Sequence, residues 1–302
     1  MAALRNELTR ELGTASERLA ALEKRSDAAV RAISEALPHV VFLQSGYGYR
    51  HRTSGRMLRY VVDDSGAPLI SPTGQPILSL ESEGPVAEID VIGTAFVLGA
   101  EGVLVTNRHV AIPWDSGEAP TPPDEELEPV VTKRMAYFPG RQAPVPVEIA
   151  HVSADTDLAL LRPTERKPLG PGISLSDRVP GPGDEVFVMG YPTGLRAILA
   201  QAGAAFLKDL EASGRTDFWE VAKALSAGRH IVPLASRGIV ARSTKTAIIY
   251  DAETTHGGSG GPVLDVDGKL IAVNTAVLPE FGGSNIGIPV SQVRKVLQQA
   301  GY

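Results

Sequence analysis

The sequence predicts a mainly β protein that begins with one long helix and carries a second helical stretch near its middle. Three observations support this fold class. Glycine and proline are frequent, with 31 and 23 of 302 residues, which indicates many turns. From Val40 onward the apolar residues come in short runs that turn residues separate, as in β structure. Helical spacing of apolar residues interrupts this pattern in residues 1–36 and 195–228.

The composition limits the possible classes of function. The chain is 43% hydrophobic and 21% charged, which is ordinary for a globular protein and excludes a wholly disordered or fibrous one. Its formal charge of -6 offers no basic face for duplex nucleic acid. Because the chain has no cysteine, disulfides, zinc–thiolate sites, iron–sulfur clusters and cysteine nucleophiles are excluded. We expect no cofactor and no metal site.

The N-terminal segment also bears on the compartment. It lacks the run of about 7–15 apolar residues that a signal peptide carries. No stretch of the chain approaches the roughly 18 apolar residues of a membrane span. If Met1 is the native start, we therefore expect a cytoplasmic protein; for a fragment of a longer protein the compartment stays open.

Residues 1–37 are predicted to form an amphipathic helix ahead of a domain of residues 38–302. Pro38 ends the helix. An apolar stripe follows the helix in alternating steps of three and four residues, with Ser26 as its one polar interruption. The stripe is formed by Leu8, Leu12, Ala15, Leu19, Leu22, Ala29 and Ile33. Two interpretations stay open: the stripe packs on its own domain, or it binds a second copy or a regulatory partner.

The expected strands follow the apolar runs at His39–Leu43, Ala95–Leu98, Val103–Thr106, Leu158–Leu161, Glu185–Met189, Val263–Leu264, Leu270–Val273 and Ile286–Pro289. Two pairs of these runs are joined by hairpin turns at residues 99–102 and 267–268. Residues 45–91 contain a short repeat, at 65–70 and 73–78, and are predicted to form turn-rich hairpins in an inserted loop.

A helical insertion is predicted over residues 195–234. Its first helix carries apolar residues at Leu195, Leu199, Ala202, Phe206 and Leu210. Gly214 is expected to stop this helix, and a second helix is expected to begin near Thr216.

Three segments carry the chemistry. His109 follows one strand, Asp157 opens an apolar run, and Ser259 lies within five consecutive small residues, Gly257–Gly261. A serine hydroxyl becomes a nucleophile when an imidazole removes its proton, and a carboxylate then orients and stabilises that imidazole. Glycines beside the serine let backbone N–H groups converge on an oxyanion. Each signal alone is weak, but all three beside strands, in the order His, Asp, Ser, predict a serine hydrolase.

The segment Gly257–Gly261 also matches the G-x-S-x-G turn of α/β-hydrolases. That fold places its catalytic histidine after the serine in the chain. The last histidine here is His256, which precedes Ser259, so the chain order excludes this alternative.

The sequence resembles the chymotrypsin-fold (trypsin-like) serine proteases, in particular their HtrA (Deg) branch. The matching segments are Gly93-Thr-Ala-Phe, Thr106-Asn-Arg-His-Val, Asp157-Leu-Ala-Leu-Leu, Gly183-Asp-Glu-Val, Gly190-Tyr-Pro-Thr-Gly, Gly238-Ile-Val, Gly257-Gly-Ser-Gly-Gly-Pro-Val-Leu and Ile286-Gly-Ile-Pro. The resemblance implies two packed six-stranded β-barrels with the active site between them, without the PDZ domain of that branch. Barrel one would span about 38–165, and barrel two about 175–302 with the helical insertion.

The resemblance also implies roles for individual residues. His109 and Asp157 would come from barrel one and Ser259 from barrel two, with an oxyanion hole formed by the backbone N–H groups of Gly257 and Ser259. The substrate pocket would lie between residues 253–256 and 275–278, and its members would be Glu253, His256, Thr275, Ala276 and Val277.

Two substrate preferences are considered for this pocket. Glu253 at its base would favour Lys or Arg at the cleaved position. If Glu253 points to solvent, the pocket takes small aliphatic side chains, and we favour this second interpretation.

The predicted function is that of a serine endopeptidase that cleaves polypeptides through an acyl-enzyme. The alternatives are a catalytically silent relative that serves as a binding module, and a chaperone-like oligomer. Residues 195–230 are expected to act as a movable cap or a docking surface for a regulatory partner, or else to pack away from the cleft.

Overall fold

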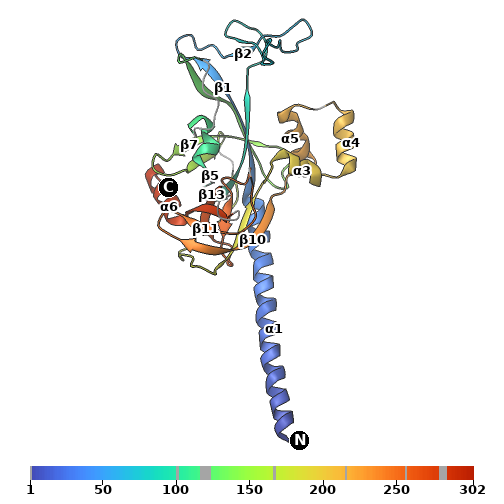
Figure 1. Ribbon diagram of the computed structural model, residues 1–302, viewed down its shortest axis with the longest axis vertical. Coiled ribbons are helices and arrows are strands. Elements are labelled where there is room, and N and C mark those ends of the chain that lie inside the picture. The colour runs from blue at the N-terminus through green and yellow to red at the C-terminus, as the bar shows by residue number, and fades with distance from the viewer. Residues whose placement is uncertain are drawn as a thin grey trace.

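The computed structural model describes residues 2–99, 102–115, 124–165, 168–214, 216–255, 257–278 and 284–302. Two closed six-stranded β-barrels form its body, and a long helix projects from it (Figure 1). The predicted fold class is confirmed, including the N-terminal helix and a helical insertion between two strands of the second barrel. Within the described ranges, no helix is long and apolar enough to cross a membrane.

Barrel one is closed by antiparallel pairing in the order β1-β4-β5-β8-β7-β6. Its interior is filled by alternate apolar residues such as Val41, Leu43 and Leu104, which are fully buried. The strands are β1 (Val40–His51), β4 (Ile89–Leu98), β5 (Val103–Thr106), β6 (Leu127–Tyr137), β7 (Val145–Val152) and β8 (Ala159–Pro163). Short helical turns flank them at η1 (Leu37–His39), α2 (Arg108–Ala111) and η2 (Pro113–Asp115).

Barrel two closes in the order β10-β11-β14-β13-β12-β9, so the two barrels share one strand order. The chain then ends in α6 (Val290–Ala300), which packs Val293 and Val296 into the body. The strands are β9 (Glu185–Gly190), β10 (Leu234–Ser243), β11 (Ile248–Tyr250), β12 (Pro262–Leu264), β13 (Leu270–Leu278) and β14 (Ser284–Pro289).

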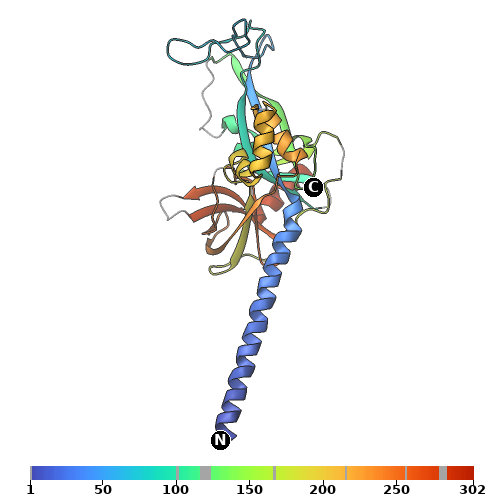
Figure 2. The same ribbon diagram turned by 90° about the vertical axis from the view of Figure 1, so that its right-hand side faces the viewer.

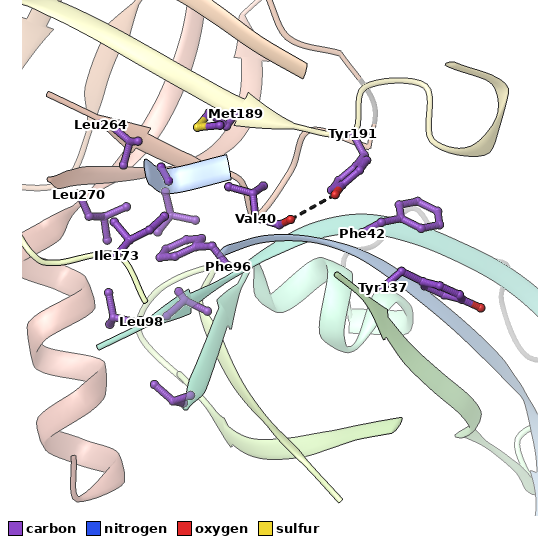
Figure 3. Close-up of a cluster of buried hydrophobic side chains, with 14 of the residues drawn as sticks. Val40, Phe42, Phe96, Leu98, Tyr137, Ile173, Met189, Tyr191, Leu264 and Leu270 are labelled. Carbon is purple, nitrogen blue, oxygen red and sulfur yellow. Dashed lines mark hydrogen bonds between the residues drawn. The ribbon is translucent and has the colours of Figure 1, made fainter. Parts of the chain in front are cut away.

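A single hydrophobic cluster joins the two barrels. Phe42 and Phe96 of barrel one pack in it with Met189 of barrel two, and all three are fully buried (Figure 3). Tyr191 crosses the same interface and donates a hydrogen bond to the carbonyl oxygen of Val40 at 3.1 Å. Burial of each such large side chain contributes about 1.5–3 kcal/mol, so the interface holds the barrels in a fixed relation.

The long helix α1 (Ala2–Ala36) packs on the body only through its C-terminal turns. Ala32 and Ala36 are buried there, and Ala29 and Ile33 pack against the main hydrophobic cluster. Figures 1 and 2 show the rest of the helix extending away from both barrels. Packing on its own domain therefore accounts for the end of the apolar stripe and not for its beginning.

The predicted loop of residues 45–91 is shorter than expected. Strand β1 continues to His51 and β4 already begins at Ile89, because residues 45–49 lie buried between β4 and β6. The insertion between them contains the two-residue strands β2 (Arg59–Tyr60) and β3 (Leu78–Ser79). The predicted turns are present, with backbone hydrogen bonds from Asp63 to Ala67 and from Ser71 to Gln75.

The helical insertion consists of three helices instead of two: α3 (Leu195–Gln201), α4 (Ala204–Ala212) and α5 (Phe218–Ala227). Gly203, with φ of +85°, breaks the first predicted helix into α3 and α4. Asp217 caps the N-terminus of helix α5, and its side chain accepts hydrogen bonds from the backbone N–H groups of Trp219 and Glu220.

Candidate active site

His109 and Asp157 meet because their strands are neighbours. Strand β5 pairs with β8 so that Thr106 lies opposite Ala159, and the residues just beyond these ends come together. His109 Nδ1 lies 2.8 Å from Asp157 Oδ2, and the backbone N–H of His109 donates to Asp157 Oδ1 at 3.0 Å. These two contacts fix the imidazole against the carboxylate and leave Nε2 for another partner.

Asp157 is held by residues on both sides of the interface. The side-chain amide of Asn107 donates to its backbone oxygen at 2.9 Å, and the hydroxyl of Thr275 donates to Oδ2 at 2.5 Å. Burial would raise the pKa of Asp157, but the hydrogen bonds from His109 and Thr275 outweigh it and hold the pKa below its usual range. The carboxylate therefore stays charged and can stabilise an imidazolium.

Ser259 lies in the glycine-rich loop between β11 and β12. Gly257 and Gly260 have φ of +93° and +85°, a region that residues with a side chain rarely adopt. A Cβ atom at Gly260 would lie 2.1 Å from the backbone oxygen of Thr94. Glycine is thus required for the loop to approach strand β4 of barrel one.

Thr94 on β4 fastens this loop across the interface. Its backbone N–H donates to the carbonyl oxygen of Ser259 at 2.9 Å, and its hydroxyl donates to that of Gly257 at 2.7 Å. The same hydroxyl accepts from the backbone N–H of Tyr191 at 3.1 Å. This role of a fully buried threonine was not predicted, since the sequence of a strand does not show which loop packs against it.

Thr275 connects the serine to the histidine–aspartate pair. Ser259 Oγ donates to the carbonyl oxygen of Thr275 at 3.4 Å, while the hydroxyl of Thr275 binds Asp157. Within the described residues, no hydrogen bond joins Ser259 Oγ to His109, and the backbone N–H groups of Gly257 and Ser259 have no acceptor. The two N–H groups are therefore free to stabilise an oxyanion.

The structure describes the side chains of only two of the five predicted pocket residues, Glu253 and Thr275. The side chain of Glu253 is exposed, and its backbone oxygen accepts a hydrogen bond from Ser236 Oγ at 2.6 Å. Thr275 lies beside the serine, but its hydroxyl points to Asp157. His256 and the side chains of Ala276 and Val277 lie outside the described residues.

The helical insertion starts beside the serine loop and then crosses to barrel one. A Cβ atom at Gly257 would lie 3.2 Å from the backbone nitrogen of Gly194, the residue before α3. Helix α5 is bound to barrel one by hydrogen bonds from Gln44 Nε2 to Phe218 O, Trp219 Nε1 to Glu88 Oε1 and Ser226 Oγ to Arg141 O. Its role as a cap or a docking surface stays a prediction.

Comparison with known proteins identifies the class. Residues 93–273 match the family of the trypsin-like peptidase domain, and the chain belongs to this family. The match includes His109, Asp157 and Ser259.

The curated relatives include proteins named after the branch that the sequence resembles. A probable periplasmic serine endoprotease, DegP-like, from Chlamydia pneumoniae is 25% identical over 225 residues, which is 74% of this chain and 37% of the relative. A protein of the same name from Brucella suis biovar 1 is 26% identical over 224 residues, which is 72% of this chain and 33% of the relative. The chain thus spans about a third of the length of the curated relatives it matches.

Solved structures share the fold. The serine endoprotease from Yersinia pestis has a TM-score of 0.51 and 16% identity, with 90% of this chain and 66% of that chain covered. The active form of the Rv3671c protease from M. tuberculosis has a TM-score of 0.51 and 15% identity, with coverage of 89% and 84%. The HtrA-type protease AlgW with a decapeptide has a TM-score of 0.52 and 20% identity, with coverage of 90% and 67%.

The names of the curated relatives correct the expectation about the compartment. They are named periplasmic proteins, which points to a periplasmic or secreted location, and the expectation of a cytoplasmic protein is wrong. A signal peptide is removed during export, so a sequence without one does not define the compartment.

Proposed function

We propose that this protein is a serine endopeptidase that cleaves polypeptides through an acyl-enzyme, with Ser259 as nucleophile, His109 as base and Asp157 as its orienting carboxylate. The observation that carries the proposal is the position of Thr275. Its hydroxyl binds Asp157, which in turn binds His109, and its carbonyl oxygen accepts from Ser259 Oγ. One residue of barrel two thus joins all three side chains at the interface.

In the proposed acylation, Ser259 Oγ turns from Thr275 O toward His109 Nε2 and attacks the scissile carbonyl carbon. His109 takes the hydroxyl proton, and the charged Asp157 stabilises the resulting imidazolium. The negative charge on the substrate oxygen is accepted by the backbone N–H groups of Gly257 and Ser259.

His109 then gives its proton to the leaving amine, so the C–N bond breaks and the acyl group stays on Ser259 Oγ. Water next attacks the acyl carbon while His109 takes its proton. His109 gives this proton to Ser259 Oγ as the bond between the acyl carbon and Oγ breaks, which leaves a new carboxyl terminus and the free hydroxyl of Ser259.

A catalytically silent binding module is the second candidate. The hydrogen bond from Ser259 Oγ to Thr275 O favours it, because this contact holds the hydroxyl away from the base. The two candidates differ in one property: only an active site with a basic His109 near Ser259 activates the hydroxyl.

A serine-directed fluorophosphonate separates the candidates. We expect covalent labelling of the wild-type protein, no labelling of Ser259→Ala, and strongly reduced labelling of His109→Ala. Competition with an excess of a peptide substrate should slow the labelling. Labelling that is equal in wild type and His109→Ala would overturn the proposal, because the hydroxyl would then react without its base.

For the substrate, we propose a pocket that takes small aliphatic side chains. The exposed side chain of Glu253 supports this, since a carboxylate in solvent provides no counter-charge for a buried Lys or Arg. Mass spectrometry of a digested peptide library should report cleavage after aliphatic residues, unchanged in Glu253→Gln. Cleavage after Lys or Arg that is lost in Glu253→Gln would contradict it.

A further inference from the structure

The projecting part of α1 carries an apolar seam that the body does not cover. The seam repeats every seven residues, with one row at positions 12, 19, 26 and 33 and the other at 8, 15, 22 and 29. A strict seven-residue repeat is typical of helices that wrap around one another. Leu12 and Leu19 are 65% and 58% exposed, whereas Ala29 and Ile33 at the other end of the seam pack on the body.

The exposed seam requires a partner for physical reasons. An isolated helix is only marginally stable in water, and most helical stability in proteins comes from packing an apolar face. Helix α1 has 35 residues, and its packing on the body is confined to the last turns (Figures 1 and 2). We infer that the seam of residues 8–19 binds the same segment of a second copy of this chain, with the two helices antiparallel.

The body itself determines the antiparallel direction. Ala32 and Ala36 are buried where the seam meets barrel two, and Ala32 contacts the turn at Gly268. In a parallel pair, the partner helix would enter the space that the body occupies there. In an antiparallel pair, the partner helix ends before this contact and its own body lies beyond the free end of α1.

The charges beside the seam select one antiparallel register. When position 12 lies opposite the partner's position 15, position 19 lies opposite the partner's position 8. Glu11 then lies beside the partner's Arg18, and the two-fold symmetry repeats this opposite-charge pair. Both side chains are exposed in the single chain and therefore available.

A shift by one heptad is less favourable. Position 12 would then lie opposite the partner's position 22, Glu11 would lie beside position 25, which is also an arginine, and Arg18 would lie beside the partner's Arg18. Repulsion between these like charges disfavours the shifted register. Because one segment supplies both apolar rows and both charges, a second copy matches it without any further protein.

Cysteine cross-linking tests the arrangement directly, since the natural chain has no cysteine. We expect a disulfide-linked dimer when Leu8→Cys and Leu19→Cys are mixed under mild oxidation, and little cross-linking of either variant alone. In the antiparallel pair the two copies of position 8 lie about 16 Å apart along the helices, too far for a disulfide. Cross-linking of Leu8→Cys with itself, or none in the mixture, would overturn the inference.

Charge reversal provides an independent readout in the whole chain of 302 residues, with the dissociation constant of the dimer measured by analytical ultracentrifugation. Glu11→Arg and Arg18→Glu should each weaken the dimer about 10-fold, because each turns two attractive pairs into repulsive ones. The double variant Glu11→Arg/Arg18→Glu should restore wild-type affinity, and the two single variants should associate when mixed.

The matched control is Val30→Glu, at a position that is 66% exposed and outside the paired segment. It should leave the dimer constant unchanged. A wild-type chain that stays monomeric at every concentration up to about 100 µM would overturn the inference. Peptidase activity does not enter either test, so its outcome is independent of the proposed function.

Discussion

The two barrels share a strand order but hold their parts of the candidate site in different ways. Barrel one assembles His109 and Asp157 by itself, through two hydrogen bonds between neighbouring chain segments. Barrel two presents Ser259 on a loop that is held mainly through its backbone, and Thr94 of barrel one supplies two of these hydrogen bonds. The contacts between His109 and Asp157 thus lie within one barrel, with one added hydrogen bond from Thr275 of barrel two, whereas the position of the serine depends on the interface.

This difference predicts which changes destroy the chemistry and which only misplace it. Side chains that react cannot be replaced, so their loss should have the largest effects. Residues that fasten the serine loop across the interface should have intermediate effects. A contact that only adjusts Asp157 should have the smallest effect.

The largest effects are expected from the three residues proposed to react. Ser259→Ala and His109→Ala should each lower kcat on the order of 10⁶-fold without unfolding the protein. Asp157→Asn should cost on the order of 10⁴-fold, because the base remains but loses its orientation. Cleavage of a quenched fluorescent peptide measures all three, with circular dichroism to check the fold. Wild-type turnover in Ser259→Ala would refute the assignment of the nucleophile.

Gly260→Ala should disturb the serine loop without removing any reacting group. Its Cβ would lie 2.1 Å from Thr94 O at a φ of +85°, so the loop must move away from barrel one. A displacement of about 1 Å at the nucleophile lowers turnover on the order of 100-fold.

The matched control for this prediction is Gly268→Ala. Gly268 also has a positive φ, +74°, but it lies in the turn between β12 and β13, beside Ala32. This variant should lose stability by about 1–3 kcal/mol and keep its kcat. Equal losses of kcat in the two variants would show that the effect of Gly260→Ala is one of general stability.

Thr94→Val should have a smaller effect than Gly260→Ala, because it deletes one hydroxyl and keeps the volume. The carbonyl oxygen of Gly257 and the backbone N–H of Tyr191 would both lose their partner. An unpaired buried polar group costs about 1–3 kcal/mol, and we expect kcat to fall about 10-fold with little change in KM. Thr94→Ser keeps the hydroxyl and should restore most of the activity; an equally inactive serine variant would contradict the role of the hydrogen bonds.

Runs of apolar residues predict many of the strands, but strands that are half exposed do not show such runs and were missed. Strand β5 lies where predicted, at Val103–Thr106, because all four of its residues are buried. Strands β6, β7 and β11 were missed, and β10 was recognised only through the resemblance. Strands β6, β7 and β10 combine half-exposed residues with charged or proline residues such as Glu128, Lys133 and Pro146, and β11 has only three residues. Helix α6 was also missed, although Val290, Val293 and Leu297 have helical spacing that a closer reading would detect.

The candidate site likewise contains residues that the sequence points to and residues that only the structure reveals. His109, Asp157 and Ser259 could be selected because a few residue types carry this chemistry, and their motifs stand beside strands. Thr94 and the link through Thr275 could not, since both depend on which backbone groups the interface brings together. The sequence therefore points to candidate reacting side chains, but not to the contacts that align them.

The smallest effect should come from Thr275→Val, which removes one hydrogen bond from Asp157 Oδ2. The pKa of Asp157 lies below its ordinary value in the folded protein, so the ionised carboxylate stabilises the fold above about pH 4. This stabilisation is lost as the pH falls through the folded-state pKa. Without the threonine hydroxyl that pKa rises toward its ordinary value, so the stabilisation is smaller and is fully lost at a higher pH.

The measurement is an acid titration followed by circular dichroism, carried out in the Ser259→Ala background to prevent self-digestion. Thr275→Val should shift the unfolding midpoint to higher pH, and Thr275→Ser, which keeps the hydroxyl, should not. In Asp157→Asn the carboxylate is absent, so adding Thr275→Val should leave the midpoint where Asp157→Asn alone places it. A shift of equal size in that background would show that Thr275 stabilises the fold through another contact.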